Sequence, residues 1–135
     1  MKTERTALDV PDRKLAGERF PPELRLRRPS EFEQVFQRGK HASDSVLVIH
    51  AMRNDLPYSR LGLSVSRRVG GAVVRNRWKR SIREAWRTQR HDLPVGMDIV
   101  VRPRKGATLD YHAIRDSLRR LLARLDRLLA RGTQS

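Results

Sequence analysis

Cationic side chains crowd one stretch of this sequence, from Arg60 to Arg90. The stretch holds ten Arg or Lys and a single acid, Glu84, so it carries a net +9 of the chain's formal charge of +15. Guanidinium and ammonium groups bind phosphates, and a folded segment that gathers them without balancing acids is typical of polyanion-binding proteins. The pattern predicts a nucleic-acid-binding surface.

A helix of about five turns, from near Ala72 to near Gln89, should carry most of these cations. On a helical wheel its apolar side chains share about a third of the circumference: Val74, Trp78, Ile82, Ala85 and Trp86. Lys79, Arg80, Arg83 and Arg87 form an adjoining cationic arc, with Arg75 at its border and Arg77 further round. Successive cations would lie ~6 Å apart along the helix, close to the phosphate spacing of one strand. The alternative, a solvated charged face, would normally interleave acids at i+4, and only Glu84 is available.

Gly70 and Gly71 precede that helix and are flanked by Arg67 and Arg68. A double glycine before a helix is usually only a turn. It can also let backbone N–H groups approach a phosphate at the positive end of the helix dipole. We therefore include both arginines among the candidate RNA contacts.

Two phenylalanines, Phe32 and Phe36, lie one turn apart in an expected first helix. Composition favours a core role for them, and stacking on unpaired bases is the alternative. The four histidines show no ligand spacing, and the aspartates sit in turns or at element ends, so we expect neither a metal site nor catalytic residues in the protein itself. There is no cysteine, which suits a reducing cytosol.

The elements predict a single α+β domain. We expect a helix capped by Ser30 and Glu33 and closed by Gly39, strands over 45–52 and 60–66 that pair antiparallel, the cationic helix, a strand over 98–102, and a leucine-rich helix between Asp110 and Gly132. Residues 1–22 should be a flexible N-terminal extension, and 23–132 the RNA-binding domain. Aromatic residues are only 5% but apolar residues reach 38% in periodic groups, which indicates a folded chain. No stretch is apolar enough for a membrane span or a secretory signal. We therefore expect a cytoplasmic protein that does not bind a membrane and has no small-molecule cofactor.

The segment from Gly62 to Arg87, G-L-S-V-S-R-R-V-G-G-A-V-V-R-N-R-W-K-R-S-I-R-E-A-W-R, closely resembles the signature of the bacterial ribonuclease P protein subunit. The resemblance extends to S-E-F-E-Q-V-F-Q-R-G-K (Ser30 to Lys40), to D-I-V-V-R-P and to the closing helix. It implies a four-stranded, mainly antiparallel sheet in the order α-β-β-β-α-β-α with a left-handed βαβ crossover. A short strand near residues 41–44 would supply the fourth strand.

The resemblance further implies a protein that assists a catalytic RNA in removing the 5′ leader from precursor tRNA, with Mg²⁺ bound mainly by that RNA. The R-N-R helix would contact the RNA subunit near its active centre and support metal binding there, through Arg75, Asn76, Arg77, Lys79, Arg80 and Arg83. A cleft between the first helix and the sheet would hold the leader, lined by Phe32, Phe36, Val48, His50 and Ser64, with Lys79 and Arg83 on its rim.

Three positions depart from the family pattern. His50 stands where many relatives have an aromatic residue, which adds a possible pH dependence; Arg67 and Arg68 replace lysines, keeping the charge with a forked geometry; and Trp78 replaces a smaller apolar residue. Two other functions remain open: a general or ribosome-associated RNA-binding protein, and an autonomous nuclease, which the missing carboxylate cluster disfavours.

Overall fold

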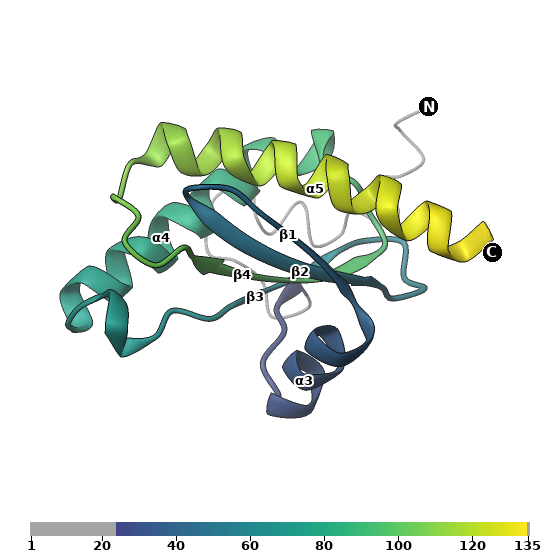
Figure 1. The fold of residues 1–135 in the computed structure, drawn as a ribbon, viewed down its shortest axis with the longest axis horizontal. Helices are drawn as coiled ribbons and strands as arrows, with labels where there is room; N and C mark the ends of the chain where they lie inside the picture. Colours follow the sequence, from purple (N-terminus) through teal and green to yellow (C-terminus); the bar gives the residue numbers. More distant parts are fainter. Residues whose placement is uncertain (1–23, 135) are drawn as a thin grey trace.

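The computed structural model describes residues 24–134, with side chains to residue 131. The extension predicted over residues 1–22 lies outside this part. Three α-helices and a four-stranded sheet make up the described chain (Figure 1). Their bounds are α3 Pro29–Arg38, β1 Lys40–Ser43, β2 Leu47–Arg53, β3 Arg60–Leu63, α4 Ala72–Gln89, β4 Met97–Pro103 and α5 Tyr111–Gln134, with short 3₁₀ turns η2 Arg67–Val69 and η3 Arg90–Asp92. The predicted order α-β-β-β-α-β-α is confirmed, including the strand near residue 41.

The start of α3 differs from the expected cap. Arg28, not Ser30, is the N-cap residue, and Pro29 takes the first helical position. The carboxylate of Glu31, rather than of Glu33, accepts hydrogen bonds from the backbone N–H groups of Arg27 and Arg28 at 3.0 and 3.1 Å. Proline has no N–H to satisfy and its φ suits the first turn, so it sets the helix start two residues earlier. Gly39 closes the helix as predicted.

The sheet has the strand order β1-β2-β4-β3. Strands β1 with β2 and β2 with β4 pair antiparallel, whereas β3 pairs parallel with β4. The predicted antiparallel pairing of the second and third strands is therefore wrong, because β4 lies between them. Helix α4 joins the parallel strands β3 and β4 as the βαβ unit that the resemblance implied; the handedness of this crossover stays a prediction.

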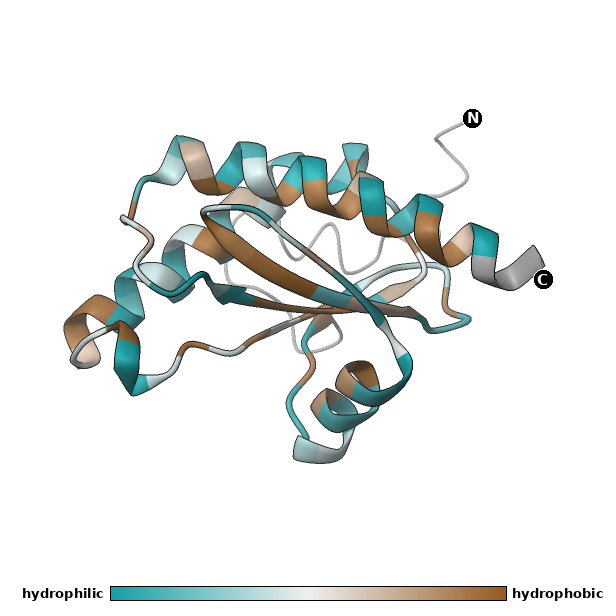
Figure 2. Cartoon of the chain, in the orientation of Figure 1, coloured by the Kyte–Doolittle hydropathy of each residue, from teal (hydrophilic) through white to brown (hydrophobic). Residues whose placement is uncertain are grey.

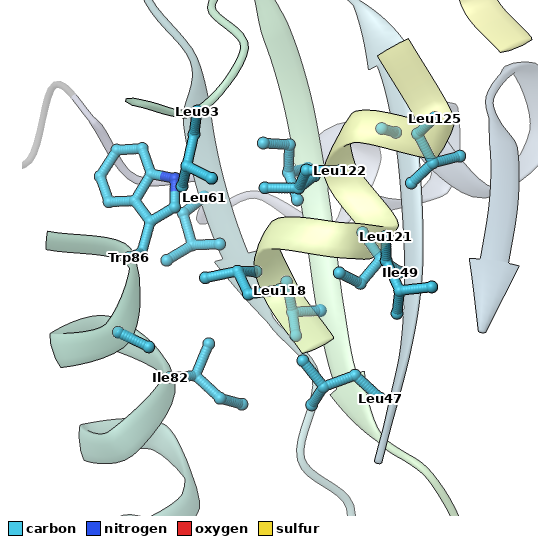
Figure 3. Close-up of a cluster of buried hydrophobic side chains, with 14 of the residues drawn as sticks. Leu47, Ile49, Leu61, Ile82, Trp86, Leu93, Leu118, Leu121, Leu122 and Leu125 are labelled. Atoms are coloured by element: carbon cyan, nitrogen blue, oxygen red, sulfur yellow. The ribbon is translucent and has the colours of Figure 1, made fainter. Parts of the chain in front are cut away.

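The two faces of the sheet are covered unequally (Figure 1). Helices α4 and α5 cover one face over the main core, in which Leu118 and Leu121 lie by Leu47 and Ile49 of β2 and Trp86 lies by Leu61 and Leu93 (Figure 3). On the other face α3 builds a smaller cluster, where Val35 packs on Val100 and Leu26. Side chains alternate between the two faces of a strand. Helix α3 covers only part of the second face, so the side chains on the rest of that face are not covered by a helix.

Helix α5 is the longest element. Its N-terminus is capped by Asp110, whose carboxylate accepts from the N–H groups of His112 and Ala113 at 3.0 and 3.3 Å. Gly132, predicted to lie beyond its end, is inside the helix, which continues to Gln134. Figure 2 shows its apolar side turned to the sheet and its hydrophilic side turned outward. The burial of this apolar side, with Leu118, Leu122 and Leu125 fully inaccessible, fixes the helix on the sheet.

Candidate nucleic-acid interface

Helix α4 holds its cations outward because its apolar side is anchored. Trp78, Ile82 and Trp86 are at most 2% exposed and face the main core. Val74, placed by the wheel on this side, is 39% exposed, because the first turn of α4 extends past the sheet. The exposed polar arc is thereby directed to solvent. We call its members the α4 arc: Arg75, Asn76, Arg77, Lys79, Arg80, Arg83 and Arg87.

The α4 arc contains only one ion pair to a carboxylate in the described part of the chain. Glu84 accepts from Nη2 and Nε of Arg87 at 2.6 and 3.1 Å, which lowers the pKa of Glu84 and raises that of Arg87. Arg87 is thus less available to a phosphate than the sequence suggested. Arg77, Lys79, Arg80 and Arg83 have no carboxylate partner among residues 24–131.

Arg83 is in an unfavourable electrostatic setting in the free protein. Burial, together with the positive charge of Arg25, lowers the pKa of its guanidinium. Arg25 belongs to the segment that bridges to Leu61, at the outer edge of β3.

The start of α4 is shaped by Gly70. Its φ of 150° lies in a region that side chains rarely adopt, and a Cβ there would stand 2.9 Å from Cβ of Val74. The turn it allows carries the exposed Arg67 and Arg68, while Nε of Arg75 donates to the carbonyl of Gly70 at 3.3 Å. The predicted grouping of these arginines around the double glycine is what the structure shows.

The open part of the α3-side sheet face gathers several predicted leader contacts. Phe36 is 42% exposed, and its ring meets that of His50 edge-on with centroids 4.9 Å apart. Val48 lies two residues from His50 on the same face of β2, and it lines a shared pocket with Ser64. Phe36, Val48, His50 and Ser64 are therefore on one surface.

Phe32 is placed differently from Phe36. Its ring packs with Leu26, Val35 and Val100 in the smaller cluster. A Cβ on Gly62 would stand 2.7 Å from Cζ of Phe32, so the missing side chain makes room for that ring. Phe32 is mainly a packing residue, as the composition of the chain had suggested.

Two residues on the open face were missed at the sequence level. The His41 ring lies 5.4 Å from that of His50, and Arg102 is the register partner of Val48. Alternation along the strands would have put both on this face, had the strand order been known. Burial first, then the charge of Arg102 and then His41, lower the pKa of His50, whose buried Nδ1 has no hydrogen-bond partner among the described residues.

An open pocket of about 610 Å³ continues this face toward η2 and the loop after β4. Val48 and Ser64 contribute to its wall, and no carboxylate lines it. Its cationic lining residues are Arg68, Arg102, Arg104 and Lys105. A pocket with this lining favours phosphate groups.

Lys79 and Arg83, predicted on the rim of the leader cleft, lie on α4, which packs on the opposite face of the sheet from α3. Neither lines the pocket. The pocket reaches α4 at Trp78, so the α4 arc and the open sheet face are neighbouring surfaces, and the contact of Lys79 and Arg83 with a leader stays a prediction.

No group of three or more His, Asp or Glu within the described residues is arranged to hold a metal ion. Cations dominate both surfaces, so the side chains do not suit a protein-held Mg²⁺ site. No helix of the described region is long and apolar enough to cross a membrane.

Comparison with known proteins identifies the family of this chain. The family model Ribonuclease P matches residues 20–126. The chain belongs to the ribonuclease P protein family. A ribonuclease P protein component from Escherichia coli O157:H7 is 44% identical over 116 residues, which cover 84% of this chain and 96% of that relative. One from Petrotoga mobilis is 36% identical and is covered over 99% of its length.

Solved structures of ribonuclease P proteins share the fold. The protein from Thermotoga maritima superposes with a TM-score of 0.70 at 38% identity, covering 74% of this chain and 96% of that one. The Staphylococcus aureus protein gives a TM-score of 0.68 at 29% identity and covers 74% and 93%. Membership in this family makes the chain the protein component of an enzyme complex in tRNA processing, with RNA as its partner.

Proposed function

We propose that this ribonuclease P protein assists a catalytic RNA subunit, which itself hydrolyses the phosphodiester bond that joins the 5′ leader to precursor tRNA. The observation that carries the proposal is the α4 arc, whose cations are exposed or half-buried and, Arg87 excepted, lack carboxylate partners among the described residues. Such cations are available to a polyanion.

The α4 arc is proposed to lie along the phosphate backbone of the RNA subunit. Arg77, Arg80 and Arg83 would each meet a phosphate, with guanidinium forks suited to two oxygens at once. Arg87 contributes less because Glu84 already holds it.

The open sheet face is proposed to hold the single-stranded leader. Phe36 and His50 present ring faces and edges to unpaired bases, and Arg68 and Arg102 lie in the adjoining pocket wall, where leader phosphates would pass. Aromatic stacking and cationic grooves together are the usual means of binding single strands. Phe32 supports this surface from beneath rather than stacking on it.

Mg²⁺ is proposed to be bound by the RNA and not by this chain. The protein would support it indirectly: its cations neutralise RNA phosphates and so reduce the Mg²⁺ concentration that the folded RNA needs. His, Asp and Glu of the described residues have no direct part in this proposal.

The leader contact can be tested in a holoenzyme reconstituted with a bacterial ribonuclease P RNA. The dissociation constant is measured for precursor tRNA and for the same tRNA without leader. Phe36→Ala should weaken precursor binding by about fivefold or more, because stacking on one base is worth about 1–3 kcal/mol, and leave leaderless tRNA unaffected. Phe36→Tyr should restore binding.

Val95→Ala is the matched control, since Val95 is an apolar side chain with 59% exposure in the loop before β4. It should change neither constant. An equal loss for both RNAs in Phe36→Ala would mean that the open face does not bind the leader.

A general RNA-binding role is the second candidate, because the same α4 arc would serve it. It predicts similar affinity for unrelated structured RNAs and no dependence on the leader. Cleavage of precursor tRNA by the protein without any RNA subunit would instead favour an autonomous nuclease.

A further inference from the structure

Helix α5 carries a second row of cations that the proposed function does not use. Its outward side is hydrophilic along the coloured part of the helix (Figure 2). We call four of its exposed arginines, spaced three or four residues apart, the α5 row: Arg120, Arg124, Arg127 and Arg131. At a rise of ~1.5 Å per residue the row extends over ~16 Å, enough to meet several phosphates.

Among the described residues, a carboxylate pairs with only one member of the row. Asp126 is engaged by Arg53 of β2, with Nη2 to Oδ1 at 2.9 Å. Asp44 takes Nη2 of Arg120 at 2.8 Å, so one member of the row is fixed at the β1–β2 loop. Arg124, Arg127 and Arg131 have no carboxylate partner within residues 24–131. A merely solvated helix would place acids four residues after these arginines, whereas α5 has no acid at those positions.

The α5 row is distant from the α4 arc. The β1–β2 loop with Asp44 marks one edge of the sheet, while Arg83 lies by Arg25 at the β3 edge. Two strands separate β1 from β3, so the sheet alone is ~14 Å wide between these strands. The side of α4 that faces α5 carries Thr88, in hydrogen-bond contact with Tyr111, rather than the cations of the arc. The two cationic surfaces therefore face different directions.

We propose that the α5 row is a second docking surface for the phosphate backbone of folded RNA, so that the protein contacts two separate RNA segments at once. The identity of the polyanion rests on the proposed function. A membrane surface fits less well, because the apolar side chains of α5 are buried in the core and are not available to insert into a lipid bilayer. Arg124, Arg127 and Arg131 are exposed, and no ion pair among the described residues competes with a phosphate for them.

The test measures affinity for a ribonuclease P RNA against salt concentration, with full-length protein. Arg124→Gln/Arg127→Gln should reduce the slope of log K against log salt by about 1 to 2, because each neutralised phosphate contributes roughly 0.7–0.9. Arg124→Lys/Arg127→Lys keeps the charge and should retain most of the slope. Thermal melting checks that both variants fold.

Arg27→Gln/Arg38→Gln is the control, since it removes the same charge from exposed arginines beside and within α3. Its slope should stay near that of the parent protein. An equal drop in this control would reduce the effect to net charge and overturn the inference, as would an unchanged slope in Arg124→Gln/Arg127→Gln.

A parallel variant, Arg80→Gln/Arg83→Gln, separates this inference from the proposed function. If this variant loses affinity for the RNA while Arg124→Gln/Arg127→Gln does not, the proposed function stands and the second surface is refuted. If neither variant loses affinity, the proposed function and the second surface are both refuted. The affinity of the parent protein and of Arg124→Gln/Arg127→Gln is also measured for precursor tRNA without the RNA subunit. A loss there in the variant would assign the α5 row to precursor tRNA, and no loss would assign it to the RNA subunit. Loss of binding to anionic phospholipid vesicles, without any change toward RNA, would contradict the proposal.

Discussion

The imidazole of His50 illustrates how the setting of one side chain decides its chemistry. It faces Arg102 from β4, His41 from β1 and the ring of Phe36 from α3. Burial and then these cations lower its pKa. The ring is therefore neutral near pH 7 and acts as an aromatic surface with one unpartnered nitrogen.

We expect His50 to titrate below its ordinary value of 6.5 in an NMR pH titration. Arg102→Gln should move the His50 pKa upward, because it removes a facing charge, whereas Arg104→Gln should not. Since the folded-state pKa is lowered, the unfolded chain takes up the proton first, and His50 should cost stability as pH falls below 6.5. A His50 pKa at or above that value would contradict this account.

Arg83 leads to a second expectation at this scale. Arg83→Gln removes a like charge beside Arg25 and breaks no ion pair to a carboxylate of the described residues. Its free energy of unfolding should stay within about 0.5 kcal/mol of the parent value, or rise. Denaturant unfolding measures this; a loss above about 1 kcal/mol would make the side chain structural.

Residue types were predictable from the sequence, but their pairing was not. The exposed cations of α4 follow from a helical wheel, since Trp78, Ile82 and Trp86 define the buried side. The neutralisation of Arg87 by Glu84 and the packing of Phe32 on Gly62 depend on rotamers and on contacts distant in sequence.

Between elements, Asp44 ties the β1–β2 loop to α5. Its carboxylate accepts from the N–H groups of Val46 and Leu47 at 2.8 and 3.0 Å and from Oγ of the fully buried Ser117 at 2.7 Å. Burial alone would raise the pKa of Asp44, but these hydrogen bonds and Arg120 lower it.

Asp44→Ala should destabilise the fold by about 2–4 kcal/mol, because several donors, including the buried hydroxyl of Ser117, lose their acceptor. The lowered pKa means that the parent protein keeps this contribution above the ordinary value of 3.8 and loses it as pH falls through the lower folded-state pKa. Chemical denaturation at neutral and acid pH measures both. An Asp116→Ala control, at an exposed residue of α5, should change little.

Element types were largely predictable, whereas their neighbours were not. Consecutive strands usually pair, which led to β2 beside β3. The chain instead inserts β4, whose Met97, Ile99 and Val101 are fully buried on the face shared with α4 and α5. A strand buried in this way belongs in the centre of the sheet, and its apolar run D-I-V-V-R was the available signal.

At the scale of the molecule, one small core holds cationic surfaces in different directions. The α4 arc lies by the β3 edge, the open sheet face lies on the α3 side, and the α5 row lies by the β1 edge. The net charge of +15 predicted a polyanion partner, and only the fold divides that charge into separate surfaces. The proposed function requires that the α4 arc assist RNA-catalysed cleavage.

The most direct measurement is the rate of leader removal from precursor tRNA by a bacterial ribonuclease P RNA at low Mg²⁺. Adding the parent protein should restore cleavage, and Arg80→Gln/Arg83→Gln should restore it at least tenfold less well at the same concentration while melting at the same temperature. If the parent protein gives no stimulation, or if the variant stimulates fully, the central claim is contradicted.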